Sequence, residues 1–425
     1  MTEWFNNSVL VVDSGWYCEV ATRLAEEFDT VFYWSPWQGD FPYAADVAPG
    51  SGLEGVERVE RLHDYLPLAD LVVFPADGYE DLQAALRRDG RRVWGAGNGF
   101  ELEHNRFKLK AYLQNHGLPV IEDVSIQGVS ELYNVLHKAE YEGWYLKLNR
   151  GYRGDMETFH HENWQRSRSW FYDTARRLGP MGDFTVWMLE PPVDGFEGGG
   201  DLYTSRGQYP GKVLIGYEIK DSCYVSTVKD YSILSPALRA GFDALMEWWA
   251  ETGACTLFST EVRITEEGIA YFIDLAARTP WPPGATWLTN CLNLGEIMWF
   301  GSEGFCAEPH FEKRFAVELL IEAPWTLGKG DWLAVEMPES VRPYAKLHGL
   351  AKFGDTYWVR PQSSKDQGGS VGSVVAASND FNTAVELCRK RVKLVEAQGL
   401  VYDDSHIQKA EKEIAKGEKA GIKFW

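Results

Sequence analysis

Short apolar runs alternate with helical patterns through residues 8–100. Apolar runs typical of strands lie at 9–13, 30–34, 71–74 and 92–94, and helical spacing of apolar residues fills 18–28, 56–65 and 79–88. Such alternation is typical of a parallel, doubly wound sheet. We therefore predict a small Rossmann-like unit at 1–104. The glycines of GAGNG at 95–99 follow the last strand and favour a turn, since glycines after a strand are a weak sign of nucleotide binding.

From residue 105 the pattern changes to α+β. An amphipathic helix is expected at 105–115, a turn at GLPV (117–120), then a strand and a helix up to 142 and a strand at 144–148. Strands follow at 184–189, 212–219, 256–264 and 270–275 around a helix at 235–252, which favours antiparallel neighbours. The last part has a strand pattern in VGSVVAAS, a helix at 382–398 and a tail at 406–419 whose mixed charges predict a solvated helix.

These patterns divide the chain into four predicted domains. They are the Rossmann-like domain at 1–104, a small unit at 105–183, a larger sheet unit at 184–312 and a small C-terminal α+β domain at 313–425. A chain of 425 residues exceeds one compact core. Several domains that share a cleft are therefore expected, and ligand sites favour such clefts.

Composition and charge narrow the class of protein. Hydrophobic residues make up 45% and aromatic residues 14%, which is enough to bury a large core. The formal net charge of -20 disfavours direct binding of nucleic acid. The N-terminal apolar run is too short to span a membrane and lacks the features of a signal peptide, so we expect a soluble, cytoplasmic protein. Six separated cysteines without a CxxC pair argue against a zinc site or a disulfide framework and favour reduced, mostly buried thiols.

Two carboxylates, Glu261 and Asp274, lie on successive predicted strands joined by a turn at 266–268. If these strands form a hairpin, both side chains can converge on one face, where oxygen ligands suit magnesium bridging phosphates. The alternative is a pair of edge-strand acids in solvent. Asp274 lies within the apolar run FIDLAAR, and a buried acid needs a partner. Magnesium or Arg278 would serve as that partner.

Cationic and glycine residues near these strands suggest phosphate chemistry. Lys147 precedes a loop that carries Gly151 and Gly154, so one ammonium and backbone amides could approach phosphate oxygens, although the Walker spacing is missing. Arg278 could bind a phosphate or a substrate carboxylate, or it could pair with Asp274. Both alternatives stay open.

Two further acids flank the segment PPVDGF. Glu190 ends a predicted strand, and Glu197 follows the segment. The prolines remove backbone donors, so adenine recognition there would rest on carbonyl groups and Glu190. The alternative is an ordinary surface loop.

Taken in order, these motifs resemble the ATP-grasp superfamily and, within it, the phosphoribosylamine–glycine ligases, along nearly the whole chain. NRFKLKAYLQNHGLPV resembles the helix whose first basic residue, here Arg106, contacts ATP. WYLKLNRGYRG resembles the strand whose lysine, Lys147, contacts phosphates beneath a glycine loop. MLEPPVDGFE resembles the hinge that directs Glu190 to adenine and Glu197 to ribose. STEVRIT and YFIDLAAR resemble the two magnesium strands.

The resemblance implies an ATP-grasp fold after the Rossmann-like domain, with a lid at 105–183 and a metal-binding subdomain at 184–312. It implies an ATP- and magnesium-dependent ligase that joins a small carboxylate, such as an amino acid, to an amine on a nucleotide or sugar phosphate through an acyl phosphate. In that reaction Lys147 and Arg278 would be catalytic. The loop at 149–158 would then be a lid.

The sequence departs from the family pattern at three places, which are the second magnesium strand, the hinge and the glycine loop. Asp274 replaces a glutamate, Ala276 replaces an asparagine ligand, and Pro191 replaces an acidic hinge residue. The loop RGDMET, at 153–158, is acidic where the family is usually rich in small residues. These departures leave room for another substrate. They also leave room for the alternative of a degenerate ATP-grasp protein that binds nucleotide without ligation.

Overall fold

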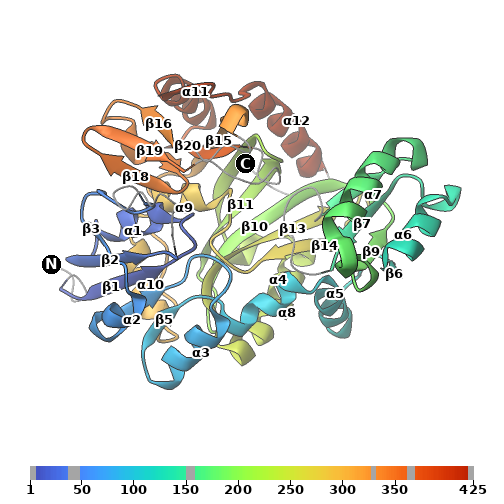
Figure 1. Cartoon of the computed structure of the whole chain (residues 1–425), viewed down its shortest axis with the longest axis horizontal. Helices are drawn as coiled ribbons and strands as arrows, with labels where there is room; N and C mark the ends of the chain where they lie inside the picture. Colours follow the sequence, from blue (N-terminus) through green and yellow to red (C-terminus); the bar gives the residue numbers. More distant parts are fainter. Residues whose placement is uncertain (1–5, 37–47, 150–157, 327–331, 361–368, 420–425) are drawn as a thin grey trace.

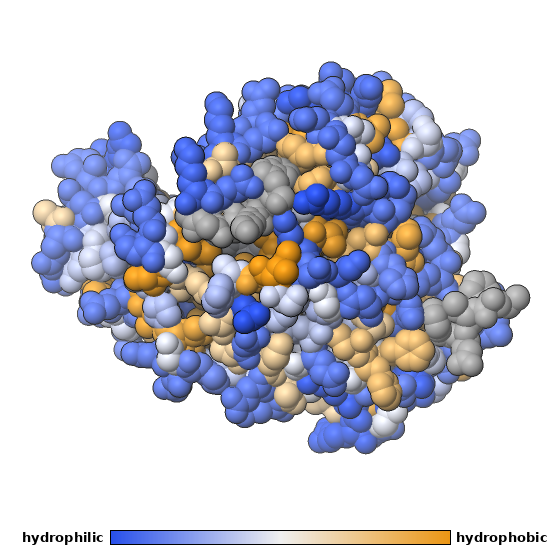
Figure 2. Space-filling model, turned by 180° about the vertical axis from the view of Figure 1, so that it is seen from behind, coloured by the Kyte–Doolittle hydropathy of each residue, from blue (hydrophilic) through white to orange (hydrophobic). Residues whose placement is uncertain are grey.

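The computed structural model describes residues 6–36, 48–149, 158–326, 332–360 and 369–419, which form four β-sheets with surrounding helices. The N-terminal sheet and the separate C-terminal sheet, which includes the strands at 333–336, 350–353 and 356–359, lie on one side of the long central sheet, and a small unit lies on the other side (Figure 1). Within the described ranges, no helix is long and apolar enough to cross a membrane. The surface seen from behind is largely hydrophilic, with hydrophobic side chains in small patches (Figure 2).

The N-terminal unit is a parallel five-stranded sheet in the order β3-β2-β1-β4-β5, as predicted. Its elements are β1 (Ser8–Val12), α1 (Cys18–Leu24), β2 (Thr30–Trp34), β3 (Val56–Arg58), α2 (Leu62–Tyr65), β4 (Leu71–Val73), α3 (Glu80–Arg88) and β5 (Arg92–Trp94). The helix predicted at 56–65 is wrong in its first part, because residues 56–58 pair with β2 and only the second part is helical. A three-residue edge strand is too short to show a period of two.

The small unit is an antiparallel sheet in the order β6-β9-β7-β8. Its elements are β6 (Val124–Gln127), α6 (Val129–Leu136), β7 (Trp144–Leu148), β8 (Thr158–His161), α7 (Trp164–Leu178) and β9 (Val186–Glu190). The short helix α4 (Glu101–His104) and α5 (Arg106–Asn115) connect it to the N-terminal unit. Helix α7, which the sequence analysis missed, packs its buried Phe171 and Leu178 into the same apolar core as Leu146 and Leu189.

The central sheet has eight strands in the order β14-β13-β10-β11-β12-β15-β20-β17, and every neighbouring pair is antiparallel, as expected. The strands are β10 (Phe196–Ser205), β11 (Lys212–Ile219), β12 (Cys223–Asp230), β13 (Cys255–Ile264), β14 (Ala270–Ala276), β15 (Phe315–Glu322), β17 (Ala345–Leu347) and β20 (Ser370–Ser378). The predicted helix at 235–252 is α8 (Pro236–Thr252), and α9 (Gly284–Asn290) packs beside β15 and β20.

Strand β10 was missed because its run GGG at 198–200 disfavours a strand. The packing of α8 against the sheet explains why position 200 is a glycine. A Cβ atom there would lie 2.4 Å from the ring of Phe242 on α8, so the helix can approach the sheet closely only at a glycine.

The C-terminal part adds three strands to the central sheet and forms its own sheet in the order β18-β19-β16-β21. Its further elements are β16 (Leu333–Glu336), β18 (Leu350–Phe353), β19 (Thr356–Val359), α11 (Phe381–Val392), β21 (Glu396–Ala397) and α12 (Ser405–Lys419). The helix predicted at 382–398 ends early because residues 396–397 pair with β16. The tail is a helix as predicted, but its residues Ile407, Ala410 and Ile414 are buried, so it is not solvated on all sides.

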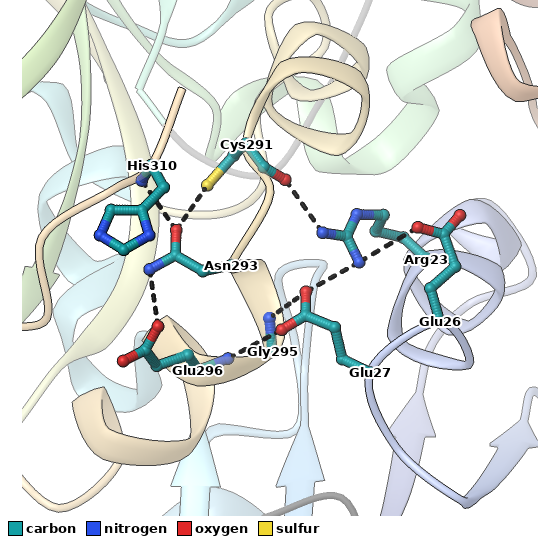
Figure 3. Close-up of polar contacts among 8 residues, drawn as sticks. All are labelled: Arg23, Glu26, Glu27, Cys291, Asn293, Gly295, Glu296 and His310. Atoms are coloured by element: carbon teal, nitrogen blue, oxygen red, sulfur yellow. Dashed lines mark hydrogen bonds and ion pairs between the residues drawn. The ribbon is translucent and has the colours of Figure 1, made fainter. Parts of the chain in front are cut away.

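Polar contacts join α1 to the N-terminal end of α10 (Leu294–Gly301), and Figure 3 shows them. Arg23 donates to the Cys291 carbonyl at 3.0 Å and pairs with Glu27 at 2.8 Å. The Glu27 carboxylate accepts from the backbone N–H groups of Gly295 at 3.0 Å and Glu296 at 3.3 Å. A carboxylate at a helix N-terminus stabilises the helix, because it accepts from free backbone N–H groups. The contacts of Arg23 and Glu27, which we call the Arg23–Glu27 clasp, therefore connect the N-terminal unit to α10. All six cysteines are free thiols, as expected.

Candidate active site

The two carboxylates expected on a hairpin lie directly opposite each other. Strands β13 and β14 pair antiparallel, with Glu261 across from Asp274 and an irregularity in the register after Glu261. Side chains directly opposite in antiparallel strands project to the same face and lie close together. The structure therefore brings together the two residues that the sequence suggested for magnesium.

Glu261 lies on β13 at a position that solvent reaches. Its side chain keeps exposed surface, but the surrounding protein desolvates it, and this desolvation together with the charge on Asp274 raises the pKa of Glu261. The charges of Lys220, Lys147 and Arg106 act in the opposite direction. The predicted cations and acids therefore share one electrostatic environment.

Arg106 is the partner of the partly buried Asp274. It begins α5, where the side chain of Asn105 caps the helix by accepting from the backbone N–H of Lys108 at 3.1 Å. A guanidinium nitrogen of Arg106, which is 8% exposed, lies 2.9 Å from Asp274 Oδ2. The expectation that Arg278 could pair with Asp274 is therefore wrong.

Arg278 binds Glu103 instead. Its Nε donates to Glu103 Oε1 at 2.9 Å and a terminal nitrogen donates to the Tyr17 hydroxyl at 3.3 Å. The other Glu103 oxygen accepts from the Ala277 N–H at 2.6 Å. Burial alone would lower the pKa of Arg278, but the Glu103 carboxylate outweighs it and raises that pKa, so the guanidinium stays charged. This pair could not be predicted, because Glu103 and Arg278 are far apart in the chain.

Lys147 and Glu190 form a buried pair in the small unit. Lys147 on β7 lies 2.7 Å from Glu190 Oε2 at the end of β9, and their side chains are 8% and 6% exposed. Lys110 on α5 lies 2.8 Å from the other Glu190 oxygen and 2.7 Å from Asp123. Desolvation would raise the pKa of Glu190, but the two ammonium groups lower it below its ordinary value. Glu190 is therefore no surface-loop residue.

The other predicted nucleotide contacts are only partly described. Glu197 on β10 is 44% exposed and forms an ion pair with Arg263 on β13. Gly151 and Gly154, with most of the expected lid loop, lie outside the described residues.

Sequence reasoning missed Lys110, Glu218 and Lys220. The pairings Glu261–Gly199 and Gly199–Gly216 place Glu261 and the two glycines on one face of the sheet. Glu218 lies on the same face, two positions after Gly216. Desolvation, with the charge of Glu261 next, raises the pKa of Glu218 well above its ordinary value. The two glycines leave a strip without side chains between the acids. Glycines inside strands, as in GGG and IGYE, were the available signal.

The site fits one divalent cation. The charge of Asp274 raises the pKa of the facing Glu261, a bound cation would offset this repulsion, and oxygen ligands suit magnesium. Ala276 offers no ligand atom, and the described residues contain no cluster of three or more histidine, cysteine, aspartate or glutamate residues able to hold a metal. Phosphate oxygens and water would complete the coordination, as is common for magnesium.

Comparison with known proteins defines the fold. No family model and no curated protein matches the chain. Phosphoribosylamine–glycine ligase from Thermotoga maritima covers 93% of this chain and 98% of its own, with 14% identity and a TM-score of 0.68. The L-amino acid ligase from Bacillus licheniformis covers 94% and 99%, with 15% identity and a TM-score of 0.59.

A third similar structure is the biotin carboxylase domain of the 2-oxoglutarate carboxylase from Hydrogenobacter thermophilus, in complex with magnesium ADP and bicarbonate. It covers 93% of this chain and 91% of its own, with 14% identity and a TM-score of 0.62. The chain therefore has the ATP-grasp architecture, which confirms the predicted fold class.

Proposed function

We propose that this chain is an ATP- and magnesium-dependent carboxylate–amine ligase. The observation that supports it most is the shared electrostatic environment of Arg106, Lys147, Glu261 and Asp274 on an ATP-grasp fold. We assign the acid to the amino acids and the amine to a nucleotide or sugar phosphate, as in the phosphoribosylamine–glycine ligases. The similarity to that ligase and to an L-amino acid ligase supports this finer assignment.

The reaction would proceed in two displacements. An oxygen of the substrate carboxylate attacks the γ-phosphorus of ATP, a new O–P bond forms, and the bond to the bridging oxygen breaks to release ADP. The amine nitrogen then attacks the acyl carbon, inorganic phosphate leaves with the C–O bond electrons, and the nitrogen loses a proton. Each step moves negative charge between oxygens, so the protein would mainly position the substrates and neutralise charge.

The chain's own cations would supply that neutralisation. Lys147 would contact phosphate oxygens beside Glu190, and Arg106 would contact them from the start of α5 while it also holds Asp274. Arg278, positioned by Glu103, would bind a substrate carboxylate or phosphate. Glu190 and Glu197 would face adenine and ribose. A magnesium ion on Glu261 and Asp274, when bound, would neutralise phosphate oxygens.

The test is ADP release with a panel of amino acids and of amines on sugar phosphates or nucleotides, with the product identified by mass spectrometry. We expect Lys147→Met and Asp274→Asn to lower turnover by about 10² to 10³, as for comparable electrostatic groups. The matched control is Lys138→Met, because Lys138 lies in the same unit with its side chain 54% exposed. Near-normal turnover in either site variant would contradict the assignment.

The second candidate is a degenerate ATP-grasp protein that binds nucleotide without ligation. Ala276, which provides no metal ligand, favours it. ATP binding without ADP release across the whole panel would support this candidate over the ligase.

A further inference from the structure

A concave site lies where β11 begins and β12 ends, away from Glu261. It has a volume of about 400 Å³ and is lined mainly by charged side chains. Its lining residues are Lys212, Val228, Lys229, Asp230, Ile233, Phe311, Glu312, Lys313, Arg314 and Asn379. We call it the basic hollow, because four of these residues are cationic and two are acidic.

The strand pairing brings the cations to both sides of β12. Lys212 lies opposite Asp230, and the backbone carbonyl of Arg314 accepts from the Val228 N–H at 2.8 Å. Val228 and Asp230 are two positions apart and so project to one face. Neighbouring strands are about 4.8 Å apart, so Lys212 and Arg314 start about 10 Å apart on either side of β12. Their long side chains can reach one ligand between them.

The charges in the hollow are unusual for this chain. The sequence has 62 acidic and 42 basic residues, so most cationic side chains can find an acidic partner. Lys313 has such a partner, because its ammonium group lies 2.9 Å from the Glu312 carboxylate. Among the described residues, neither Lys212 nor Arg314 has a carboxylate within ion-pair distance, and the Arg314 guanidinium packs over the Phe315 ring at 4.6 Å. Asp230 lies on β12 between Lys212 and Arg314, but the cations of the hollow outnumber its acids, and a concave site with excess positive charge favours an anionic ligand.

We propose that the basic hollow binds a small phosphate-bearing molecule. A guanidinium and several ammonium groups match the oxygens of a phosphate, and the volume lies in the range of small-molecule sites. The hollow is separate from the proposed metal site, because the register places Glu261 two strands away and level with Gly216, which is four positions or about 14 Å along β11 from Lys212. This inference does not depend on the ligase activity.

Calorimetric titration with inorganic pyrophosphate tests the proposal on the full chain. We expect Lys212→Met/Arg314→Met to weaken pyrophosphate binding by at least about tenfold, since two charged hydrogen-bond donors are lost. Lys212→Glu is a second variant that leaves Arg314 on Phe315, and it should weaken binding in the same direction. Raising the salt concentration should weaken binding to the unaltered chain.

The matched control is Arg61→Met/Lys138→Met, which removes the same charge at exposed positions elsewhere and should keep the affinity. Lys147→Met separates the two sites, because it should leave binding in the basic hollow unchanged. The proposal is overturned if the unaltered chain shows no saturable binding, or if binding is lost in Lys147→Met but kept in the Lys212 variants. Equal affinity for citrate would overturn the selectivity for phosphate.

Discussion

Replacing Glu190 by glutamine tests the buried pair at the proposed nucleotide site most directly. Glutamine keeps the size of the side chain and one acceptor oxygen but removes the charge. In the unaltered chain, the two Glu190 oxygens lie 2.7 Å from Lys147 and 2.8 Å from Lys110. Lys110 keeps Asp123 after the change, but Lys147, 8% exposed, loses the carboxylate that compensates it.

Breaking a buried pair by removing one partner costs about 3 to 5 kcal/mol, because an uncompensated charge stays buried. We therefore expect Glu190→Gln to lower the free energy of unfolding by about 3 kcal/mol or more at pH 7. The pKa of Glu190 is below its ordinary value of 4.5 in the folded chain, so its stabilising effect is present above pH 4.5 and is lost as the pH falls through the folded-state pKa. The difference between variant and unaltered chain should therefore shrink on acidification.

Urea unfolding followed by tryptophan fluorescence, at several pH values from about 3 to about 7, measures this difference on both sides of the ordinary glutamate pKa. Removing both charges with Glu190→Gln/Lys147→Met should cost less than the sum of the single changes, because the double variant leaves neither of these two partners charged alone. A loss below about 1 kcal/mol at pH 7, or a loss that does not change with pH, would refute the reasoning.

Three further predictions follow from other contacts. Glu27→Ala should lower the free energy of unfolding by about 3 kcal/mol in denaturant titrations, whereas Glu26→Ala, at a site 64% exposed, should change it by less than about 0.5 kcal/mol; equal losses would contradict the clasp. Calorimetry in the presence of ADP should show that magnesium binding weakens by up to about tenfold per pH unit below the raised pKa of Glu261, because the protonated carboxyl binds no cation. Asp274→Asn should move this pH dependence to lower pH, and an unchanged pH dependence would contradict the coupling between Glu261 and Asp274. His348→Phe should raise the melting temperature, corresponding to about 1 kcal/mol, because it removes two buried ring nitrogens without partners among the described residues; a lower melting temperature would show that those nitrogens matter to the fold.

The elements with a clear period were predictable from the sequence. The parallel strands follow from short apolar runs, and α5 follows from the helical spacing of its apolar residues. The hairpin of Glu261 and Asp274 and the strand in VGSVVAAS follow from their strand patterns. Elements without such a period were missed. Glycine-rich β10 and the three-residue β3 are examples, because contacts with α8 and with β2 stabilise them rather than their own side-chain pattern.

The candidate site was predictable as a set of residues but not as a set of pairs. The chain order indicated Arg106, Lys147, Glu190, Glu261 and Asp274, and the structure joins them by two ion pairs, one strand pairing and the charges that act on Glu261. Which cation meets which acid depends on how distant segments pack. A single sequence holds no information on that packing.

The eight-stranded sheet has a consequence for dissecting the chain. Its last three strands come from residues beyond 313, and β15 hydrogen-bonds along β12. A fragment that stops at residue 312 would leave the backbone groups of β12 unpaired along an apolar edge, which invites self-association. Deletion of the C-terminal part therefore would not give a smaller folded protein. Two fragments produced separately would have to associate by pairing β12 with β15 before the central sheet could form.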